Sequence, residues 1–184
     1  MNETLQAWLA REEELRQRWA QGAGAGAFNP ATMASLTGLQ QLQAMLRGEM
    51  PFATIGKTMD FLPVEMSEGV AVFQGAPGPG HLNPMGGVHG GWYATLLDSA
   101  LGCSVHTCMP AGKSYTTLEL KVNLVRALTP KVQRVRAIGR VIHVGGQTAT
   151  AEARLEGPDG KLYAHGSTTC LVFDAKPFDA KQPR

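Results

Sequence analysis

Residues 81–91 read H-L-N-P-M-G-G-V-H-G-G, and residues 88–108 continue as a run rich in leucine, alanine and other apolar residues. The run is long enough for a helix of about six turns, and Pro110-Ala111-Gly112 ends it. Strand-like segments surround it, so the pattern predicts one long apolar helix among strands. A carboxylate, Asp98, stands inside the run, where burial is costly unless a neighbouring group uses the charge.

Six segments of strand-like alternation flank this helix, two before it and four after it. Turns rich in glycine and proline separate them. The segments are 52–66, 69–75, 114–128, 132–144, 147–156 and 162–173. This order predicts an α+β fold in which a curved antiparallel sheet of about six strands wraps around one long central helix. An open sheet exposes an edge strand, and pairing with a second copy of the chain would cover it.

The first 50 residues have a helix-like pattern instead of the strand-like alternation. Apolar residues recur every three to four positions over 3–20, which predicts a helix. Gly22–Ala27, G-A-G-A-G-A, is a flexible break, and a second helix is expected over 30–47. These helices either support packing or a dimer, or cover a site. The predicted divisions are an N-terminal helical extension (1–50), a main domain (51–173) and a fraying C-terminal tail (174–184).

Composition excludes several classes of protein. The net charge of +2 on the 184 residues argues neither for nor against a nucleic-acid surface, and no basic block appears, so nucleic acid is not an expected partner. Arg134, Arg136 and Arg140 alternate with apolar residues, which indicates a solvated strand face. The sequence shows neither a signal peptide nor an apolar run of about 18 residues, so no membrane association is expected. Three cysteines without a Cys-x-x-Cys pair favour a reducing cytoplasm. The scattered histidines suggest no metal site.

The string from Asn83 to Asp98 has the spacing N-x-x-G-x-x-H-G-G followed by an aspartate seven residues later. Together with the predicted strands around a central helix, this string resembles the hotdog-fold acyl-CoA thioesterases, and most closely their phenylacetate-degradation (PaaI-like) branch. T-L-E-L-K-V-N-L-V-R at 117–126 extends the resemblance. It covers about 51–173 and leaves the N-terminal extension outside. It implies hydrolysis of an acyl-CoA or aryl-CoA thioester without metal or other cofactor, in a homodimer or a tetramer of two dimers.

The helix entrance offers a physical basis for this chemistry. Backbone N–H groups in the first turn of a helix have no partner inside the helix, and the helix dipole is positive there. A thioester carbonyl placed against the Gly90 N–H would be polarised, and its developing oxyanion would be stabilised. Glycine permits that approach because it has no side chain.

Asp98 lies too far from this entrance to act at the same carbonyl within one chain. Nine residues separate it from His89, which in a helix is a rotation of about 900° and a rise of about 13 Å. Two antiparallel copies of the helix across a two-fold axis would bring the groups together. We therefore expect a shared site, with Asn83, His89 and Gly90 from one subunit and Asp98 from the other.

The resemblance implies a role for each residue. Asp98 would be the nucleophile or the general base that activates water, Thr117 would position the water, and Asn83 would orient the water or the carboxylate. The residues implied in substrate binding are Gly86, Gly91 and Arg126. The family often places a basic residue near residues 144–147 to meet the nucleotide of CoA, but this chain has none there. Other candidate phosphate contacts are Lys113, Lys121, Arg134 and Arg136.

Each role has a structural alternative. Asp98 could be a core acid whose carboxyl is hydrogen-bonded to a helix terminus. His89 could be a helix cap, Asn83 a turn residue and Thr117 an ordinary strand residue. Two other functions compete with hydrolysis. A hotdog hydratase acting on enoyl or hydroxyacyl thioesters fits the H-G-G string and this aspartate poorly. A non-catalytic acyl-CoA-binding protein gives no reason for a carboxylate beside the carbonyl.

Overall fold

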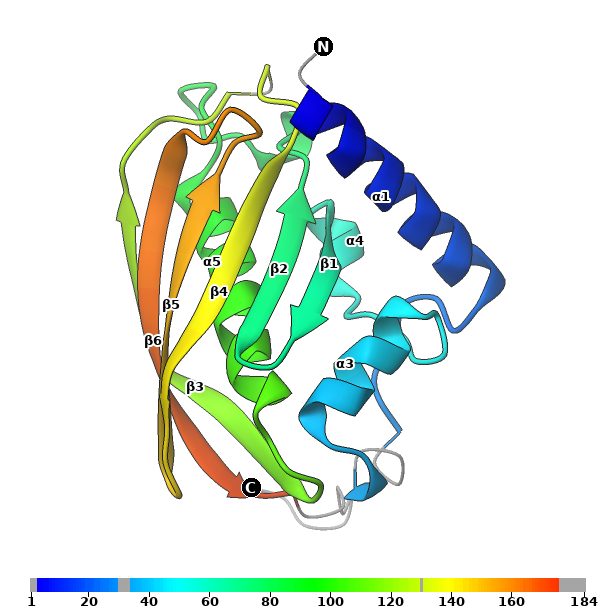
Figure 1. The fold of residues 1–184 in the computed structure, drawn as a ribbon. Helices are drawn as coiled ribbons and strands as arrows, with labels where there is room; N and C mark the ends of the chain where they lie inside the picture. Colours follow the sequence, from blue (N-terminus) through cyan, green and yellow to red (C-terminus); the bar gives the residue numbers. More distant parts are fainter. Residues whose placement is uncertain (1–2, 30–33, 130, 176–184) are drawn as a thin grey trace.

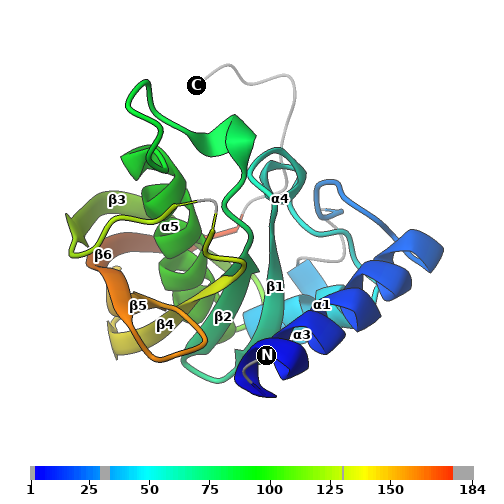
Figure 2. The same cartoon turned by 90° about the horizontal axis from the view of Figure 1, so that it is seen from above.

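The computed structural model describes residues 3–29, 34–129 and 131–175. In these residues six strands form one antiparallel sheet in the order β1-β2-β4-β5-β6-β3. The strands are β1 (Phe61–Ser67), β2 (Val70–Gly75), β3 (Lys113–Leu124), β4 (Val135–Val144), β5 (Thr148–Glu156) and β6 (Leu162–Asp174). The sheet curves around the long helix α5 (Gly90–Thr107), as Figures 1 and 2 show. The predicted α+β hotdog architecture is confirmed.

Helix α5 is buried along most of its length because its apolar residues face the sheet on several sides. Leu96, Leu97, Leu101 and Val105 have no measurable solvent exposure. Close approach between α5 and β4 depends on Gly139, where a β-carbon would lie 2.2 Å from the Ala100 carbonyl oxygen. The helix spans nearly the predicted residues, since both of its ends are encoded locally by capping and turn residues.

The N-terminal helices agree only partly with prediction. Helix α1 (Glu3–Gln21) lies where it is expected, but α3 (Gly38–Leu46) starts later than the predicted second helix. Thr37 caps α3 in a reciprocal pair with Gln40, which sets the start. Residues 30–33 of the predicted helix lie outside the described residues. The short helix α4 (Ile55–Thr58) occupies part of the predicted strand 52–66, so the strand prediction is wrong before Phe61.

Helix α1 is held against the sheet by a buried carboxylate, Glu12. Arg134 Nε donates to Glu12 Oε2 at 2.6 Å, and Gln74 Nε2 donates to the same oxygen at 2.8 Å. Burial alone would raise the pKa of Glu12, but these hydrogen bonds and the arginine charges outweigh it and lower the pKa. The Arg136 guanidinium lies 4.4 Å from the centre of the Trp8 ring. The prediction of a solvated face is therefore wrong for Arg134 and Arg136, because α1 covers them.

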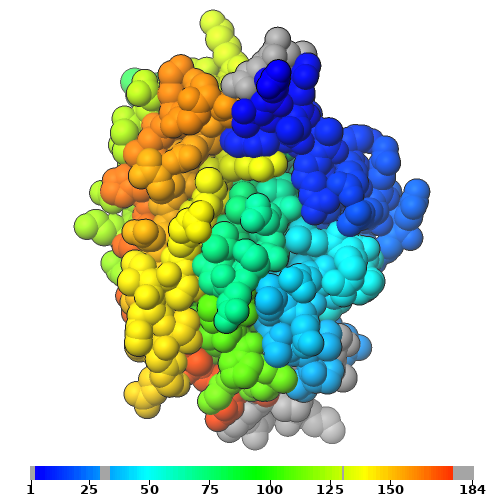
Figure 3. All heavy atoms as spheres, viewed as in Figure 1, coloured from blue at the N-terminus to red at the C-terminus, as the bar shows by residue number. Residues whose placement is uncertain are grey.

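The two edges of the sheet have different surroundings. Helices α1, α3 and α4 all contact β1, and Figure 3 shows the extension packed beside this part of the sheet. The β3 edge is open, and Leu118 and Leu124 on it are 60% and 55% exposed. An uncovered apolar edge favours pairing with another strand. No described helix is long and apolar enough to cross a membrane. The predicted C-terminal tail lies outside the described residues from 176 onward.

Candidate functional site

Asn83 organises the loop that precedes α5. Its side-chain Oδ1 accepts hydrogen bonds from the Met85 N–H at 2.9 Å and the Gly87 N–H at 3.2 Å. Its backbone N–H donates to the Gly87 carbonyl at 2.8 Å. Gly86 has a φ of 83°, in the left-handed region that glycine tolerates. Asn83 is therefore a turn residue in this structure, with its carbonyl oxygen already engaged by the loop.

His89 is the N-cap of α5. Its Nδ1 accepts a hydrogen bond from the Gly91 N–H at 2.9 Å, and its backbone N–H donates to the His81 carbonyl at 2.8 Å. This is the capping role that the sequence left open for His89. The Gly91 N–H is thereby occupied. The Gly90 N–H has no acceptor among the described residues, so it remains available at the positive end of the helix.

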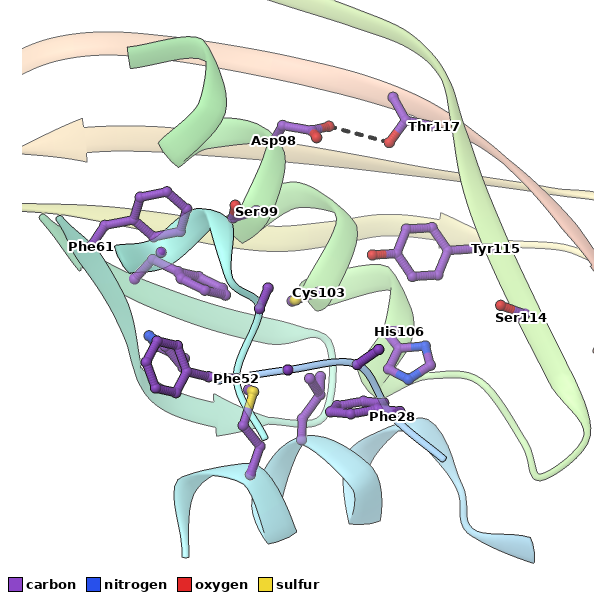
Figure 4. Close-up of a pocket in the computed structure, with 18 of the residues that line it drawn as sticks. Phe28, Phe52, Phe61, Asp98, Ser99, Cys103, His106, Ser114, Tyr115 and Thr117 are labelled. Atoms are coloured by element: carbon purple, nitrogen blue, oxygen red, sulfur yellow. Dashed lines mark hydrogen bonds between the residues drawn. The ribbon is translucent and has the colours of Figure 1, made fainter. Parts of the chain in front are cut away.

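Asp98 lies on α5 beside the edge strand β3. Thr117 Oγ1 donates to Asp98 Oδ1 at 3.2 Å (Figure 4). Burial raises the pKa of the Asp98 carboxyl, and the hydrogen bond from Thr117 opposes that rise. Asp98 is half-buried and Thr117 is exposed. The carboxylate is thus held in a fixed position at a place that small molecules can reach.

A pocket of about 640 Å³ adjoins this carboxylate. Asp98 and Thr117 lie on one side of it, and Phe28 and Phe52 lie on the opposite side (Figure 4). Its size is within the usual range for small-molecule sites. The sequence predicted Asp98 and Thr117 as site residues, but it assigned no role to most of the other lining residues. Most of those are ordinary apolar residues from distant segments, and nothing in their local spacing marks them.

The other ionisable groups in the pocket are uncharged near neutral pH. Burial raises the pKa of the Cys103 thiol to about 12. Burial also lowers the pKa of His106 to about 4, so its ring is neutral. Gln41 Nε2 donates to the Leu36 carbonyl, so Gln41 Oε1 accepts from His106 Nε2 at 3.0 Å. His106 Nδ1 has no partner among the described residues. No described group of three His, Cys, Asp or Glu side chains could hold a metal ion.

The pocket does not contain the glycine loop. Asn83, His89 and Gly90 are absent from its lining, whereas Asp98 and Thr117 belong to it. Both halves of the predicted site nevertheless lie beside β3. A β-carbon on Gly90 would be 3.3 Å from Leu124, at one end of the strand, and Asp98 bonds Thr117 farther along it. Within one chain the two halves stay apart.

The candidate phosphate contacts fall into two groups. Arg134 and Arg136 hold α1, and Lys113 Nζ pairs with Asp174 at 2.6 Å. Arg126 and Lys121 are exposed, and no ion pair of either is seen among the described residues. These two remain the more available cations near the β3 edge.

Comparison with known proteins identifies the domain. Residues 85–164 match the family model described as Thioesterase superfamily. This part of the chain is similar in sequence to the thioesterase superfamily, and it lies in a hotdog fold. The match covers residues 85–91 of the loop, α5, β3, β4 and β5, so Gly90, Asp98 and Thr117 lie within it, whereas Asn83 precedes it. The N-terminal extension lies outside it.

Individual relatives support the same assignment for the hotdog domain. The chain is 35% identical over 79 residues to "Putative esterase PA1618" of Pseudomonas aeruginosa, covering 42% of this chain and 53% of that protein. The chain therefore matches about half the length of this curated relative. The "putative thioesterase, phenylacetic acid degradation-related protein" of Ralstonia eutropha JMP134 superposes with a TM-score of 0.65 at 26% identity, covering 71% of this chain and 98% of that one.

A third relative is the conserved protein PA5202 of Pseudomonas aeruginosa, with a TM-score of 0.62 and 28% identity. That alignment covers 66% of this chain and 95% of PA5202. The predicted resemblance to the PaaI-like hotdog thioesterases is confirmed, and the predicted enzyme class agrees with the names of these relatives.

Proposed function

We propose that this protein hydrolyses acyl-CoA or aryl-CoA thioesters. The observation that supports this most is the Asp98 carboxylate, which Thr117 holds at one side of a largely apolar pocket. An acyl group in the pocket would place its thioester carbon beside this carboxylate. Burial raises the pKa of Asp98. A carboxylate therefore occupies a position where an uncharged side chain would be more favourable for stability. Such perturbed groups in pockets are typical of catalytic sites.

Two chemical roles for Asp98 remain open. As a nucleophile, its carboxylate oxygen attacks the thioester carbon, the carbon–sulfur bond breaks, and the thiolate leaves and takes up a proton; water then hydrolyses the resulting anhydride to the free acid and the Asp98 carboxylate. As a general base, it takes a proton from water as the water oxygen attacks that carbon, and the thiolate leaves and takes up a proton. Both roles require the ionised carboxylate, which the Thr117 hydroxyl stabilises by donating to it. Thr117 thus acts on the carboxylate in this proposal, in addition to its predicted contact with water.

The second half of the site comes from a partner subunit. Gly90 of α5 lies beside Leu124, and Asp98 lies beside Thr117 on the same open strand. A two-fold axis between these positions would bring Gly90 of one subunit opposite Asp98 of the other. The Gly90 N–H would then stabilise the oxyanion of the substrate held at Asp98. A homodimer paired at β3 has this arrangement, and a tetramer of two dimers is compatible with it.

The remaining candidates support these groups. Asn83 and Gly86 close the turn, and His89 caps α5 through the Gly91 N–H, so together they fix the loop from which the Gly90 N–H would reach the substrate. Arg126 is exposed near the same strand and is a candidate contact for a CoA phosphate.

A panel of short-chain, medium-chain and aromatic acyl-CoA thioesters, assayed for free thiol release, tests the proposal. We expect thiol release with a kcat/KM that depends on the acyl group. A hydratase would instead consume the double bond of an enoyl-CoA without releasing thiol. A binding protein would bind acyl-CoA in a calorimetric titration without turnover. Absence of thiol release across the panel would rule out the proposed activity.

A further inference from the structure

The far wall of the pocket is built by the N-terminal extension. Phe28, Leu42 and Met45 line it together with Phe52, and all four precede the first strand. Phe28 and Phe52 lie across the pocket from Asp98 and Thr117 (Figure 4). The segment that matches the thioesterase superfamily begins only at residue 85. The wall opposite the carboxylate therefore consists of residues that lie outside the segment matching the family.

Hydrogen bonds and ring packing hold the first part of this wall in place. The Gly26 N–H donates to the Phe52 carbonyl at 2.9 Å, and the Phe52 N–H donates to the Gly24 carbonyl at 3.0 Å. The Phe52 and Trp19 rings pack with their centres 4.5 Å apart. The loop that carries Ala27 and Phe28 is thus attached to the segment that leads into α4.

Helix α3 is fixed just as closely. The Trp19 Nε1–H donates to the Met45 carbonyl at 2.7 Å, and the Gly38 N–H donates to the Met109 carbonyl at 2.8 Å. A β-carbon on Gly38 would lie 1.8 Å from the His106 carbonyl oxygen, so the helix start touches the end of α5. The buried bond between Gln41 and His106 closes the same contact. The wall is a packed part of one chain and needs no partner subunit.

The chemistry of the lining limits what the pocket accepts. Cys103, His106 and Tyr115 are uncharged near neutral pH because burial disfavours their charged forms. Ser99 donates its hydroxyl to the Thr95 carbonyl within its own helix. Beyond Asp98 the pocket offers mainly aromatic and aliphatic surface, which favours an uncharged apolar group and disfavours a carboxylate or phosphate.

We propose that the N-terminal extension determines the acyl-group specificity of this site. An uncharged apolar acyl group, larger than acetyl, would run from the thioester carbon at Asp98 toward Phe28, and Ala27, Phe28 and Met45 would limit its length. The proposal depends on the proposed thioesterase function for the identity of the ligand, but the wall itself follows from the packing of the extension.

Two substitutions in the wall should move specificity in opposite directions. Ala27→Trp fills the pocket, so the ratio of kcat/KM for octanoyl-CoA to that for butyryl-CoA should fall about tenfold or more. Phe28→Ala lengthens the pocket, so the ratio of kcat/KM for dodecanoyl-CoA to that for octanoyl-CoA should rise several-fold, since the longer chain gains apolar burial where the ring stood. Opposite shifts distinguish a specificity wall from a merely structural one, because lost stability would not reverse the preference.

Ala23→Trp is the matched control. Ala23 is exposed in the same loop and is not part of the pocket lining, so this variant should keep both wild-type ratios. If Ala27→Trp and Phe28→Ala also keep the wild-type ratios while thioesters are still hydrolysed, the extension does not set specificity and the proposed function stands.

A binding measurement separates the two proposals. S-octyl-CoA, a thioether that cannot be hydrolysed, is titrated calorimetrically into the full chain and the three variants. We expect Ala27→Trp to weaken its affinity about tenfold and Ala23→Trp to leave it unchanged. If these affinities are found but no thioester is hydrolysed, the wall limits the bound acyl group and the thioesterase function is rejected. Equal affinity in wild type and Ala27→Trp would reject the proposal that the wall determines acyl-group specificity.

Discussion

The two halves of the candidate site are built in different ways. The loop half, residues 82–91, is held largely by its own hydrogen bonds, from Asn83 to the following turn and from His89 to Gly91. The acid half depends on tertiary contacts, because Asp98 and Thr117 are 19 residues apart and lie on a helix and a strand. The loop half presents the Gly90 N–H, which has no acceptor in the part of the chain that the structure describes, whereas the acid half keeps a carboxylate in a half-buried position that raises its pKa.

This difference shows why one helix carries both halves without joining them. Gly90 is the first residue of α5 and Asp98 is eight residues later, a rise of about 12 Å. His89 is the N-cap and lies outside the helix, so the helical rotation counted from His89 does not give the direction in which Gly90 faces. Gly90 and Asp98 both face β3, at separate positions. Such a layout suits a site completed by a second copy of the chain across the open edge.

Removal of the carboxylate should have the largest effect. Asp98→Asn should lower kcat by about 10²–10⁴-fold, because an acid–base or nucleophilic group is lost. Thermal unfolding should show no loss of stability: the folded state raises the pKa of Asp98, so the carboxyl lowers stability as the pH rises from its unfolded-state pKa to its folded-state pKa, and the asparagine removes this cost. Asp159→Asn, in an exposed turn, is the control. Near wild-type hydrolysis by Asp98→Asn would exclude the acid half from catalysis.

Removal of the loop donor should have the next largest effect. Gly90 is the first residue of α5, where proline fits the helix but has no N–H. His89, at φ −63° and ψ 137°, already has the conformation that a following proline favours. Gly90→Pro should therefore lower kcat about 10²-fold by deleting an oxyanion donor. Gly90→Ala keeps the N–H and separates the donor effect from crowding against Leu124. Equal loss in both variants would contradict the donor role.

Mixing the two inactive variants tests whether the halves act in trans. A mixed dimer of Asp98→Asn and Gly90→Pro has one site with both changes and one intact site. Unfolding and refolding equal amounts together should restore about a quarter of wild-type activity, since half the dimers are mixed and each has one working site. Each variant refolded alone provides the baseline. No recovery, with dimers verified by light scattering, would show that each site lies within one chain.

The smallest expected effect concerns the Asp98–Thr117 bond. Burial raises the pKa of Asp98 and the Thr117 hydroxyl opposes this, so Thr117→Val should raise the pKa further. The acid limb of the kcat/KM profile should move to higher pH, with a loss of roughly fivefold on that limb and less at alkaline pH. Thr117→Ser, which keeps the hydroxyl, should retain the wild-type profile. An unmoved acid limb would mean that another group controls it.

Prediction from the sequence succeeded where the causes are local. The start and end of α5 follow from a capping residue and from a turn at residues 110–112, and they were predicted to within about two residues. Prediction failed over 52–60, where apolar residues alternate as in a strand. There Phe52 packs on Trp19 of the extension, and its burial comes from that contact instead of a sheet face.

The apolar central helix, the number of strands and the glycine-rich loop before the helix could all be predicted from the sequence, because periodicity, capping and turn chemistry act over a few residues. Three features depend on the folded chain: Thr117 holds Asp98, α1 covers Arg134 and Arg136, and Phe28 lies across the pocket from the carboxylate. Those contacts join segments far apart in the chain, and their side chains are ordinary packing residues until folding brings them together.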